Sequence, residues 1–241
     1  MFGVLDGHGE AGDLVSRFVA DRLPSRVVKN PHFLAAPGVA MKEELDRLER
    51  AMLGDASIDT EFSGSTAVLA AVRDRKLIAC NVGDSRAIVA RLVDGKLQAI
   101  EVTIDHKPDR EDEKRRIVAT GGRVFAVEYD DGISGPPRVW LGHMDIPGLA
   151  MSRSIGDTVA HSAGVSSEPE MFTYDFHEDD KLVIIASDGL WEFMTNQEVI
   201  DFIARVSDPK RAVDMLVAES SARWMKEEQV IDDTTIIIAY L

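Results

Sequence analysis

The sequence predicts an α+β protein in which two layers of antiparallel sheet are covered on the outside by helices. Three observations support this prediction: strand-like runs, helical spacing, and the order in which the two alternate. Short apolar runs rich in β-branched residues stand between turn residues, as is typical of strands, and longer stretches carry apolar residues at helical spacing. Strands and pairs of helices alternate along the chain, which favours helices packed on sheet faces. The 241 residues, 45% of them hydrophobic, can bury such a core.

The predicted elements begin with an apolar strand at residues 2–5. Apolar residues at three- and four-residue intervals then predict two helices, at 14–27 and 41–52. Three β-rich runs follow, and the turn residues between them predict an antiparallel meander, to which a fourth strand at 97–103 can be added. The three runs are residues 66–72, 76–82 and 86–92.

The second half of the chain opens with a short charged helix at 111–119, which Gly121-Gly122 should stop. Residues 124–164 contain glycines and prolines without a steady periodicity, so we expect an irregular flap over a site. No linker or repeat interrupts the chain, and we predict one domain over residues 1–241. The remaining predicted elements are a buried strand at 181–186, helices at 196–206 (with Thr195 as N-cap) and 209–226, and a last strand at 234–240.

Carboxylates lie at the ends of three of the predicted strands. Asp6-Gly7-His8-Gly9 ends the first strand, Ser187-Asp188-Gly189 follows the buried strand at 181–186, and Asp232-Asp233 precedes the last strand. An isolated Asp-Gly is most often an ordinary turn. Three such strand ends, one of them with a histidine, instead favour a single oxygen-lined pocket for hard divalent cations.

Eight motifs along the chain carry a family resemblance. In order they are VLDGHGE, GSTAVLAAV, NVGDSRAIV, DHKP, GLAMSRSIGD, EPE, ASDGLWE and DDTT. In sequence and rough spacing the chain resembles the PPM (type 2C) metal-dependent protein serine/threonine phosphatases, from Phe2 to the last strand. The resemblance implies an αββα sandwich, and phosphorylated proteins as substrates.

The resemblance also implies roles for single residues. Asp6 would bridge two metal ions, Mn²⁺ or Mg²⁺, with the carbonyl oxygen of Gly7 as a further ligand. Asp188 and Asp232 would complete the ligands of one of the two ions. Such a pair of ions would polarise a phosphoryl oxygen and generate a bridging hydroxide that attacks phosphorus in line. Asp84, in Gly83-Asp84-Ser85-Arg86, could hold a third ion, or it could be a turn residue that accepts backbone amides.

His8 is the candidate general acid, because an imidazole titrates near neutral pH and this one lies two residues from Asp6. A hydrogen-bonded structural histidine is the alternative. The single cysteine, Cys80, lies in an apolar strand without an arginine-rich loop after it, which argues against a cysteine phosphatase. The other conspicuous residues are predicted to be structural or solvent-facing: His106 in loop packing, Arg86 in the fold, Asp157 as an anchor of the flap, and Glu192, which could also orient a metal-bound water.

Composition limits the class of partner. The chain has 27 basic and 42 acidic residues, a formal charge of −15. This charge repels phosphate backbones and argues against nucleic-acid binding. No apolar stretch is long enough to cross a membrane, and one cysteine cannot form an internal disulfide. We therefore expect a monomer in the cytoplasm or the nucleus.

The start of the sequence departs from the family pattern. Family members usually carry, before the DGHG strand, a further strand with a phosphate-binding arginine, whereas this sequence starts directly at Met1. The expectation is a sandwich without the usual first strand, with weak activity and a high Mn²⁺ requirement. Three interpretations stay open: a piece of an active phosphatase, a pseudophosphatase scaffold, or a hydrolase of small phosphate esters. The presence of Asp6, His8, Asp188 and Asp232 favours an active enzyme.

Overall fold

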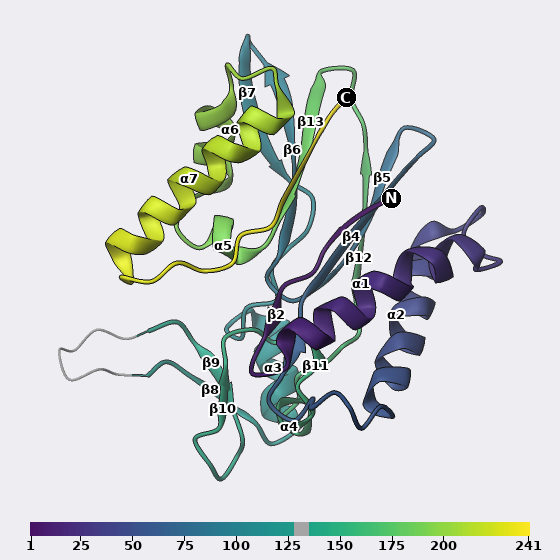
Figure 1. The fold of residues 1–241 in the computed structure, drawn as a ribbon, viewed down its shortest axis with the longest axis vertical. Helices are drawn as coiled ribbons and strands as arrows, with labels where there is room; N and C mark the ends of the chain where they lie inside the picture. Colours follow the sequence, from purple (N-terminus) through teal and green to yellow (C-terminus); the bar gives the residue numbers. More distant parts are fainter. Residues whose placement is uncertain (128–134) are drawn as a thin grey trace.

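The computed structural model describes residues 1–127 and 135–241 and confirms the α+β sandwich (Figure 1). Two four-stranded antiparallel sheets pack face to face. The first has the strand order β1 (Phe2–Val4), β4 (Ala67–Arg73), β5 (Lys76–Val82) and β12 (Glu170–Asp175). The second has the order β14 (Ile236–Tyr240), β13 (Asp180–Ala186), β6 (Arg86–Val93) and β7 (Lys96–Glu101).

Apolar side chains from both sheets meet between the two layers. Many of them are alanine and valine, which fit the narrow space between facing sheets. The buried members are Val4, Val68, Ala70, Leu77, Ala79, Ala87, Val89, Val102, Val183 and Ile185.

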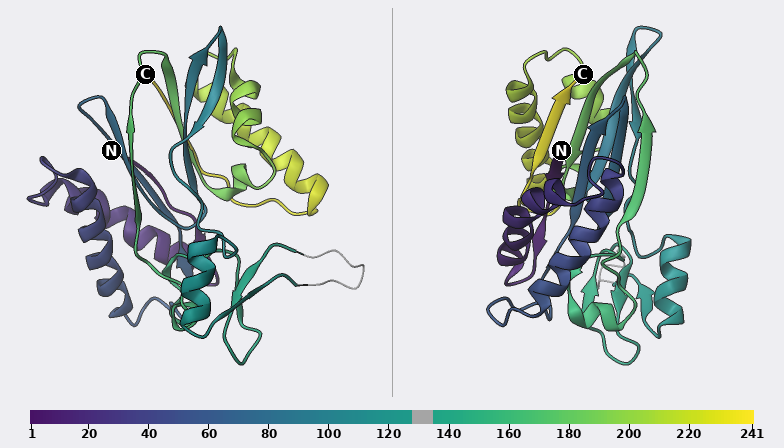
Figure 2. Two further views of the ribbon diagram at one scale, coloured as in Figure 1. Left: turned by 180° about the vertical axis from the view of Figure 1, so that it is seen from behind. Right: turned by 90° about the vertical axis from the view of Figure 1, so that its right-hand side faces the viewer.

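Two pairs of helices cover the outer faces of the sandwich (Figure 2). Helices α1 (Gly12–Lys29) and α2 (Pro37–Leu53) pack on the first sheet, and α6 (Asn196–Ile203) and α7 (Pro209–Glu227) pack on the second. The predicted cap of α6 is present, because Thr195 and Glu198 form a reciprocal capping box. No helix in the described parts of the chain is long and apolar enough to cross a bilayer.

The predicted meander is wrong at its second turn. Strands β4 and β5 do pair as a hairpin, but β6 lies in the other sheet, and the neighbour of β5 is β12. Strands β5 and β6 are buried on both faces, so their sequences lack the alternation that would assign them to one layer. The segment around Asp84 therefore carries the chain from one sheet to the other, and this crossing positions Asp84 at the end of both layers.

A smaller lobe lies beside the sandwich at the end where Asp84 crosses. It contains a three-stranded sheet and, with α3 (Glu111–Ala119) and α4 (Thr158–Ser162), a small apolar core around Ile117, Val139 and Ala160. Residues 124–164, predicted to be mainly irregular, thus contain short strands and a helix in their described part, while residues 128–134 lie outside the description. The strands of this sheet are β8 (Arg123–Phe125), β9 (Arg138–Trp140) and β10 (Pro147–Leu149).

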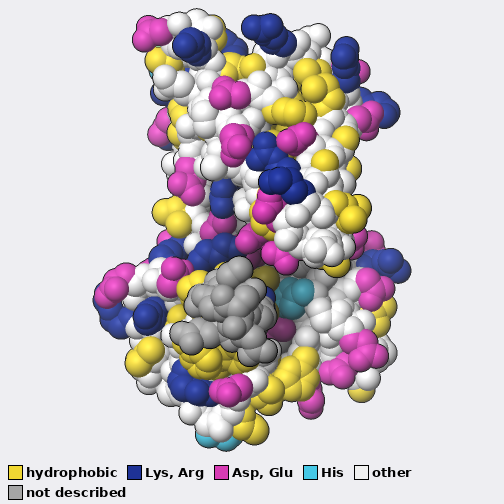
Figure 3. Space-filling view, turned by 90° about the vertical axis from the view of Figure 1, so that its left-hand side faces the viewer, with side chains coloured by type: hydrophobic (Ala, Val, Ile, Leu, Met, Phe, Trp, Pro, Cys, Tyr) yellow, Lys and Arg dark blue, Asp and Glu magenta, His cyan; other side chains and the backbone are white. Residues whose placement is uncertain are grey.

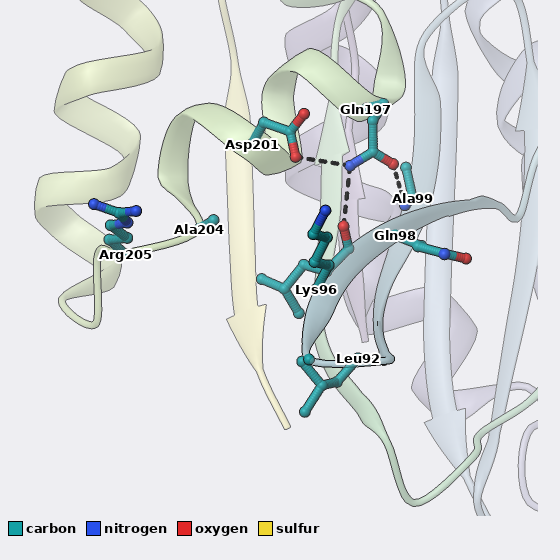
Figure 4. A pocket seen from close by; sticks show the side chains of 10 residues that line it. Leu92, Lys96, Gln98, Ala99, Gln197, Asp201, Ala204 and Arg205 are labelled. Carbon is teal, nitrogen blue, oxygen red and sulfur yellow. Dashed lines mark hydrogen bonds between the residues drawn. The ribbon is translucent and has the colours of Figure 1, made fainter.

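One edge of the second sheet, strand β7, is covered by a glutamine from α6 (Figure 4). The Gln197 amide donates to the carbonyl of Leu97 (3.0 Å) and accepts the amide hydrogen of Ala99 (3.0 Å). It also donates to Asp201, at 2.9 Å. A side chain therefore takes the hydrogen bonds that a neighbouring strand would otherwise form.

Candidate active site

The candidate site lies where the ends of strands from both sheets meet. Asp6 follows β1, Asp84 lies between β5 and β6, Asp188 begins the short helix α5 (Asp188–Trp191) after β13, and Asp232 lies shortly before β14. The carboxylates of Asp84 and Asp232 each raise the pKa of both Asp6 and Asp188, so the four groups share one electrostatic environment. In the space-filling view, charged side chains and a histidine gather where the sandwich meets the smaller lobe (Figure 3).

Hydrogen bonds that involve both backbone and hydroxyl groups fix two pairs of these strand ends. The amide of Asp6 donates to the Thr66 hydroxyl (3.1 Å), which is 2.7 Å from the hydroxyl of Ser85, the residue after Asp84. On the other side, the amide of Ser187 donates to the carbonyl of Thr235 (3.1 Å), and the amide of Thr235 donates to the hydroxyl of Ser187 (3.1 Å). The strands themselves thus bring the predicted acidic residues together.

Burial and mutual repulsion perturb the acids strongly. Burial, and then the charges of Asp84 and Asp6, raise the pKa of Asp188 from its ordinary 3.8 to about 9. Burial also raises the pKa of Asp6 to about 6, although a hydrogen bond shared with the Asp188 carboxyl opposes this shift. The pKa of Asp232 is raised as well, chiefly by burial. Such a group of acids is electrostatically unfavourable unless protons or cations neutralise it.

Asp84 is the most buried of the four, at 1% exposure. Its Oδ2 accepts a hydrogen bond from Lys107 (2.8 Å), whereas its buried Oδ1 has no hydrogen-bond partner among the described residues. Neither oxygen accepts a hydrogen bond from a backbone amide of the described residues. The turn-capping role considered for Asp84 is therefore not the one that the structure gives it. A buried carboxylate oxygen without a partner beside three other acids suits an oxygen-seeking cation.

A different group in the described residues forms a compact trio of possible metal ligands. His177, Glu178 and Asp179 have ligand atoms that all lie within 4.8 Å of one another, in an exposed turn at the opposite end of β13 from Asp188. Exposed acidic turns are common without an ion, and nothing else marks this one as a site. The four aspartates are spread more widely than this trio.

His8 forms a close pair with Asp157. Its Nε2 lies 2.6 Å from Oδ2 of Asp157, whose residue is 3% exposed. Burial by itself would lower the pKa of His8, but the hydrogen bond and charge of Asp157 outweigh it, and the pKa is raised. Sequence reasoning gave Asp157 only an anchoring role, and a separation of 149 positions gave no signal of the contact between the two residues.

Glycine at position 64 makes this pair possible. His8 in β2 (Gly7–His8) and Gly156 in β11 (Ile155–Gly156) both pair with Gly64 of β3 (Gly64–Ser65), so β3 lies between the histidine and the aspartate. The Asp157 side chain crosses the middle strand where that strand has no side chain. A Cβ added at Gly64 would lie 2.1 Å from Oδ2 of Asp157.

Comparison with known proteins identifies the family. A family model described as protein phosphatase 2C matches residues 1–234. The chain belongs to the protein phosphatase 2C family. Among its relatives, "Probable protein phosphatase 2C 35" of Arabidopsis thaliana is 35% identical, over 100% of this chain and 73% of the relative. "Probable protein phosphatase 2C 64" of Oryza sativa subsp. japonica is 37% identical, over 99% of this chain and 58% of the relative.

Solved structures confirm the phosphatase 2C fold. The serine-threonine phosphatase 2C of Toxoplasma gondii superposes with a TM-score of 0.83, covering 99% of this chain and 84% of that one, at 21% identity. A C. elegans sex determining protein gives a TM-score of 0.74 over 99% of this chain and 55% of that one. At these identities the likeness concerns the fold. Family membership places the chain among the protein serine/threonine phosphatases, which are hydrolases.

Other motifs of this phosphatase 2C chain pack beside the site. His106 is buried, with Nε2 3.0 Å from Glu170, and burial lowers its pKa to about 4, so it packs as a neutral ring. Arg86 forms a two-pronged pair with Asp105 (2.9 and 2.6 Å). Lys107, which sequence reasoning passed over, is the residue of this loop that faces the acids.

We expect Gly64→Ala to separate His8 from Asp157 in this phosphatase 2C fold. The new methyl group cannot coexist with the Asp157 carboxylate, so the aspartate must move away, and the histidine loses its partner. Turnover of a phosphoserine peptide should fall by about 10–10²-fold, the loss expected for misplaced catalytic groups. Gly54→Ala is the matched control, since its Cβ would find no atom closer than 3.5 Å. Equal turnover in both variants would contradict this role of Gly64.

Proposed function

We propose that this chain is an active metal-dependent phosphatase that hydrolyses phosphoserine and phosphothreonine in proteins, with Mn²⁺ or Mg²⁺ as its cations. The observation that carries the proposal is the buried Oδ1 of Asp84, which has no hydrogen-bond partner within residues 1–127 and 135–241 and lies beside acids of raised pKa. Four negative charges gathered at one end of the sandwich, one of them almost fully buried, have a physical reason to persist when divalent cations neutralise them.

The donor set fits these cations. Asp6, Asp188 and Asp232 would hold two ions together with the carbonyl of Gly7, and Asp84 could contribute to a third. All these donors are oxygens, which Mg²⁺ and Mn²⁺ prefer, and the one cysteine, Cys80, is buried in β5 away from any role as a ligand. The bound ions would activate a water molecule and neutralise charge on the phosphoryl oxygens.

Side chains of the protein would protonate the leaving group and orient the residue that does so. His8 would be the general acid that gives its proton to the serine or threonine oxygen as the bond to phosphorus breaks. Asp157 keeps the imidazole oriented and, by raising its pKa, keeps more of it protonated at neutral pH. Lys107 binds one oxygen of Asp84, and the other, which no group in the described part of the chain contacts by a hydrogen bond, would be available to a cation.

Assays with and without metal test the proposal and separate it from its alternatives. We expect the purified chain to dephosphorylate a phosphoserine peptide with Mn²⁺ or Mg²⁺ and to lose this activity in EDTA. Cys80→Ser should remain active, because the thiol takes no part. Binding of Mn²⁺ without turnover of any phosphate ester would favour a scaffold, and turnover of p-nitrophenyl phosphate without any of the peptide would favour a small-ester hydrolase.

A further inference from the structure

Helix α2 contributes a buried glutamate to the back of the candidate site. Glu49 is 6% exposed, and both of its carboxylate oxygens lie 3.3 Å from the backbone nitrogen of Gly156, 107 residues away. Among the described residues it forms no ion pair with a lysine, arginine or histidine. Burial raises its pKa to about 7. Hydrogen bonds with the Gly156 amide and the Ser167 side chain oppose this shift. A buried carboxyl group without a cationic partner is costly, so a packing role alone explains it poorly.

The backbone that Glu49 contacts has an unusual conformation. Gly156 and Asp157 both have positive φ angles, +85° and 44°, and the second of these is uncommon for a residue with a side chain. The amide of Asp157 donates to the carbonyl of Ser63, at 2.9 Å. Glu49 and Ser63 thus hold successive amides of this segment, and the resulting conformation directs the Asp157 carboxylate across Gly64 to His8.

We infer that Glu49 is a positioning residue for the general acid. It holds the backbone at Gly156, the backbone sets the direction of Asp157, and Asp157 orients His8. The inference rests on the proposed function, because it assigns Glu49 to the step in which His8 protonates the leaving oxygen. Glu49 itself acts only through the backbone of Gly156 and touches no substrate.

Two substitutions separate hydrogen bonding from packing. Glu49→Gln keeps an acceptor oxygen for the Gly156 amide, whereas Glu49→Met keeps the length of the side chain and removes the acceptor. We expect Glu49→Met to lose about tenfold or more in kcat on a phosphoserine peptide with little change in KM, and to change about twofold or less on p-nitrophenyl phosphate, whose leaving group needs no proton. Glu49→Gln should stay within about threefold of the parent on both substrates.

A second buried glutamate on the same helix provides the matched control. Glu44 is 4% exposed, but it pairs with Arg26 and Arg47 instead of with the backbone at Gly156. Glu44→Met should lower thermal stability without favouring one substrate over the other. In a His8→Gln background, Glu49→Met should cause no further loss on the peptide, because both changes remove the same step.

The outcomes distinguish this inference from the proposed function. If His8→Gln loses rate mainly on the peptide but Glu49→Met loses rate equally on both substrates, the role inferred for Glu49 is wrong, while the role of His8 as general acid is still supported. If His8→Gln itself affects both substrates equally, the acid role and the inference fall together. Should Glu49→Met not fold, Glu49→Asp, which draws the acceptor back from Gly156, must show the selective loss, and equal losses there overturn the inference.

Discussion

Asp188→Asn should remove metal-dependent turnover and, at the same time, stabilise the metal-free protein at pH 8. The substitution removes a cation ligand, so we expect activity on a phosphopeptide to fall by at least about 10²-fold, in line with the several kcal/mol that bound metals supply. Calorimetry should show much weaker Mn²⁺ binding, and Asp232→Asn should weaken binding too.

The stabilising half of this prediction follows from the sign of the pKa shift. Folding raises the pKa of Asp188 from 3.8 to about 9, so the folded protein holds this proton more tightly than the unfolded chain does. The resulting stabilisation is fully present below about pH 4 and is lost as the pH rises toward 9. Asparagine carries no charge and escapes this loss. Each kcal/mol recovered corresponds to about 2–4 °C in Tm for a chain of this size.

Melting curves in EDTA at pH 5 and pH 8 provide the measurement. The parent should lose stability between these values, and Asp188→Asn should lose less. Asp214→Asn, at an exposed carboxylate on α7 paired with Lys210, is the control and should follow the parent. An Asp188→Asn protein that binds Mn²⁺ as tightly as the parent would show that this carboxylate is no ligand.

His8→Gln should lose about 10²–10⁴-fold in rate on a phosphoserine peptide and far less on p-nitrophenyl phosphate. Glutamine can form hydrogen bonds in place of the imidazole but cannot supply a proton, which the serine alkoxide needs and the nitrophenolate does not. His177→Gln, in the exposed turn before β13, is the control and should leave both rates unchanged. Equal losses on the two substrates would assign His8 a structural role.

The partner of His8 gives this prediction a pH dependence. Asp157 raises the pKa of His8, so Asp157→Asn should lower that pKa. The imidazolium then loses its proton at a lower pH, and the alkaline side of the peptide activity profile should move to lower pH, while the p-nitrophenyl phosphate profile stays in place. An unmoved alkaline side would mean that another group sets it.

The fold and the acidic residues were predictable from the sequence because local patterns encode them. Apolar runs ending in Asp-Gly placed Asp6 and Asp188 at strand ends, and helical spacing located α1 and α2. The assignment of β6 to a sheet was not predictable, because strands buried on both faces show no alternation. Strand β12, which the predicted elements did not include, is half-buried with charged residues at both ends.

The contacts that complete the candidate site escaped prediction for a different reason. The pairing of His8 with Asp157, and that of Glu49 with Gly156, join residues 149 and 107 positions apart. The first of these contacts depends on the crossing over Gly64, which becomes visible only when three short strands lie side by side. No periodicity or motif in one sequence encodes such a relation.

Gln197 on the edge of β7 has a consequence for how the molecule meets its neighbours. An open strand edge is a template on which a second chain, or a misfolded copy, can extend the sheet. Here Gln197 already occupies the backbone groups of Leu97 and Ala99 in the middle of the β7 edge. Asp201 accepts a hydrogen bond from the glutamine amide and so holds it in this orientation. The second sheet therefore cannot grow by strand addition at this point of β7 unless Gln197 first releases both backbone groups, which ties the protection of this edge to one side chain of α6.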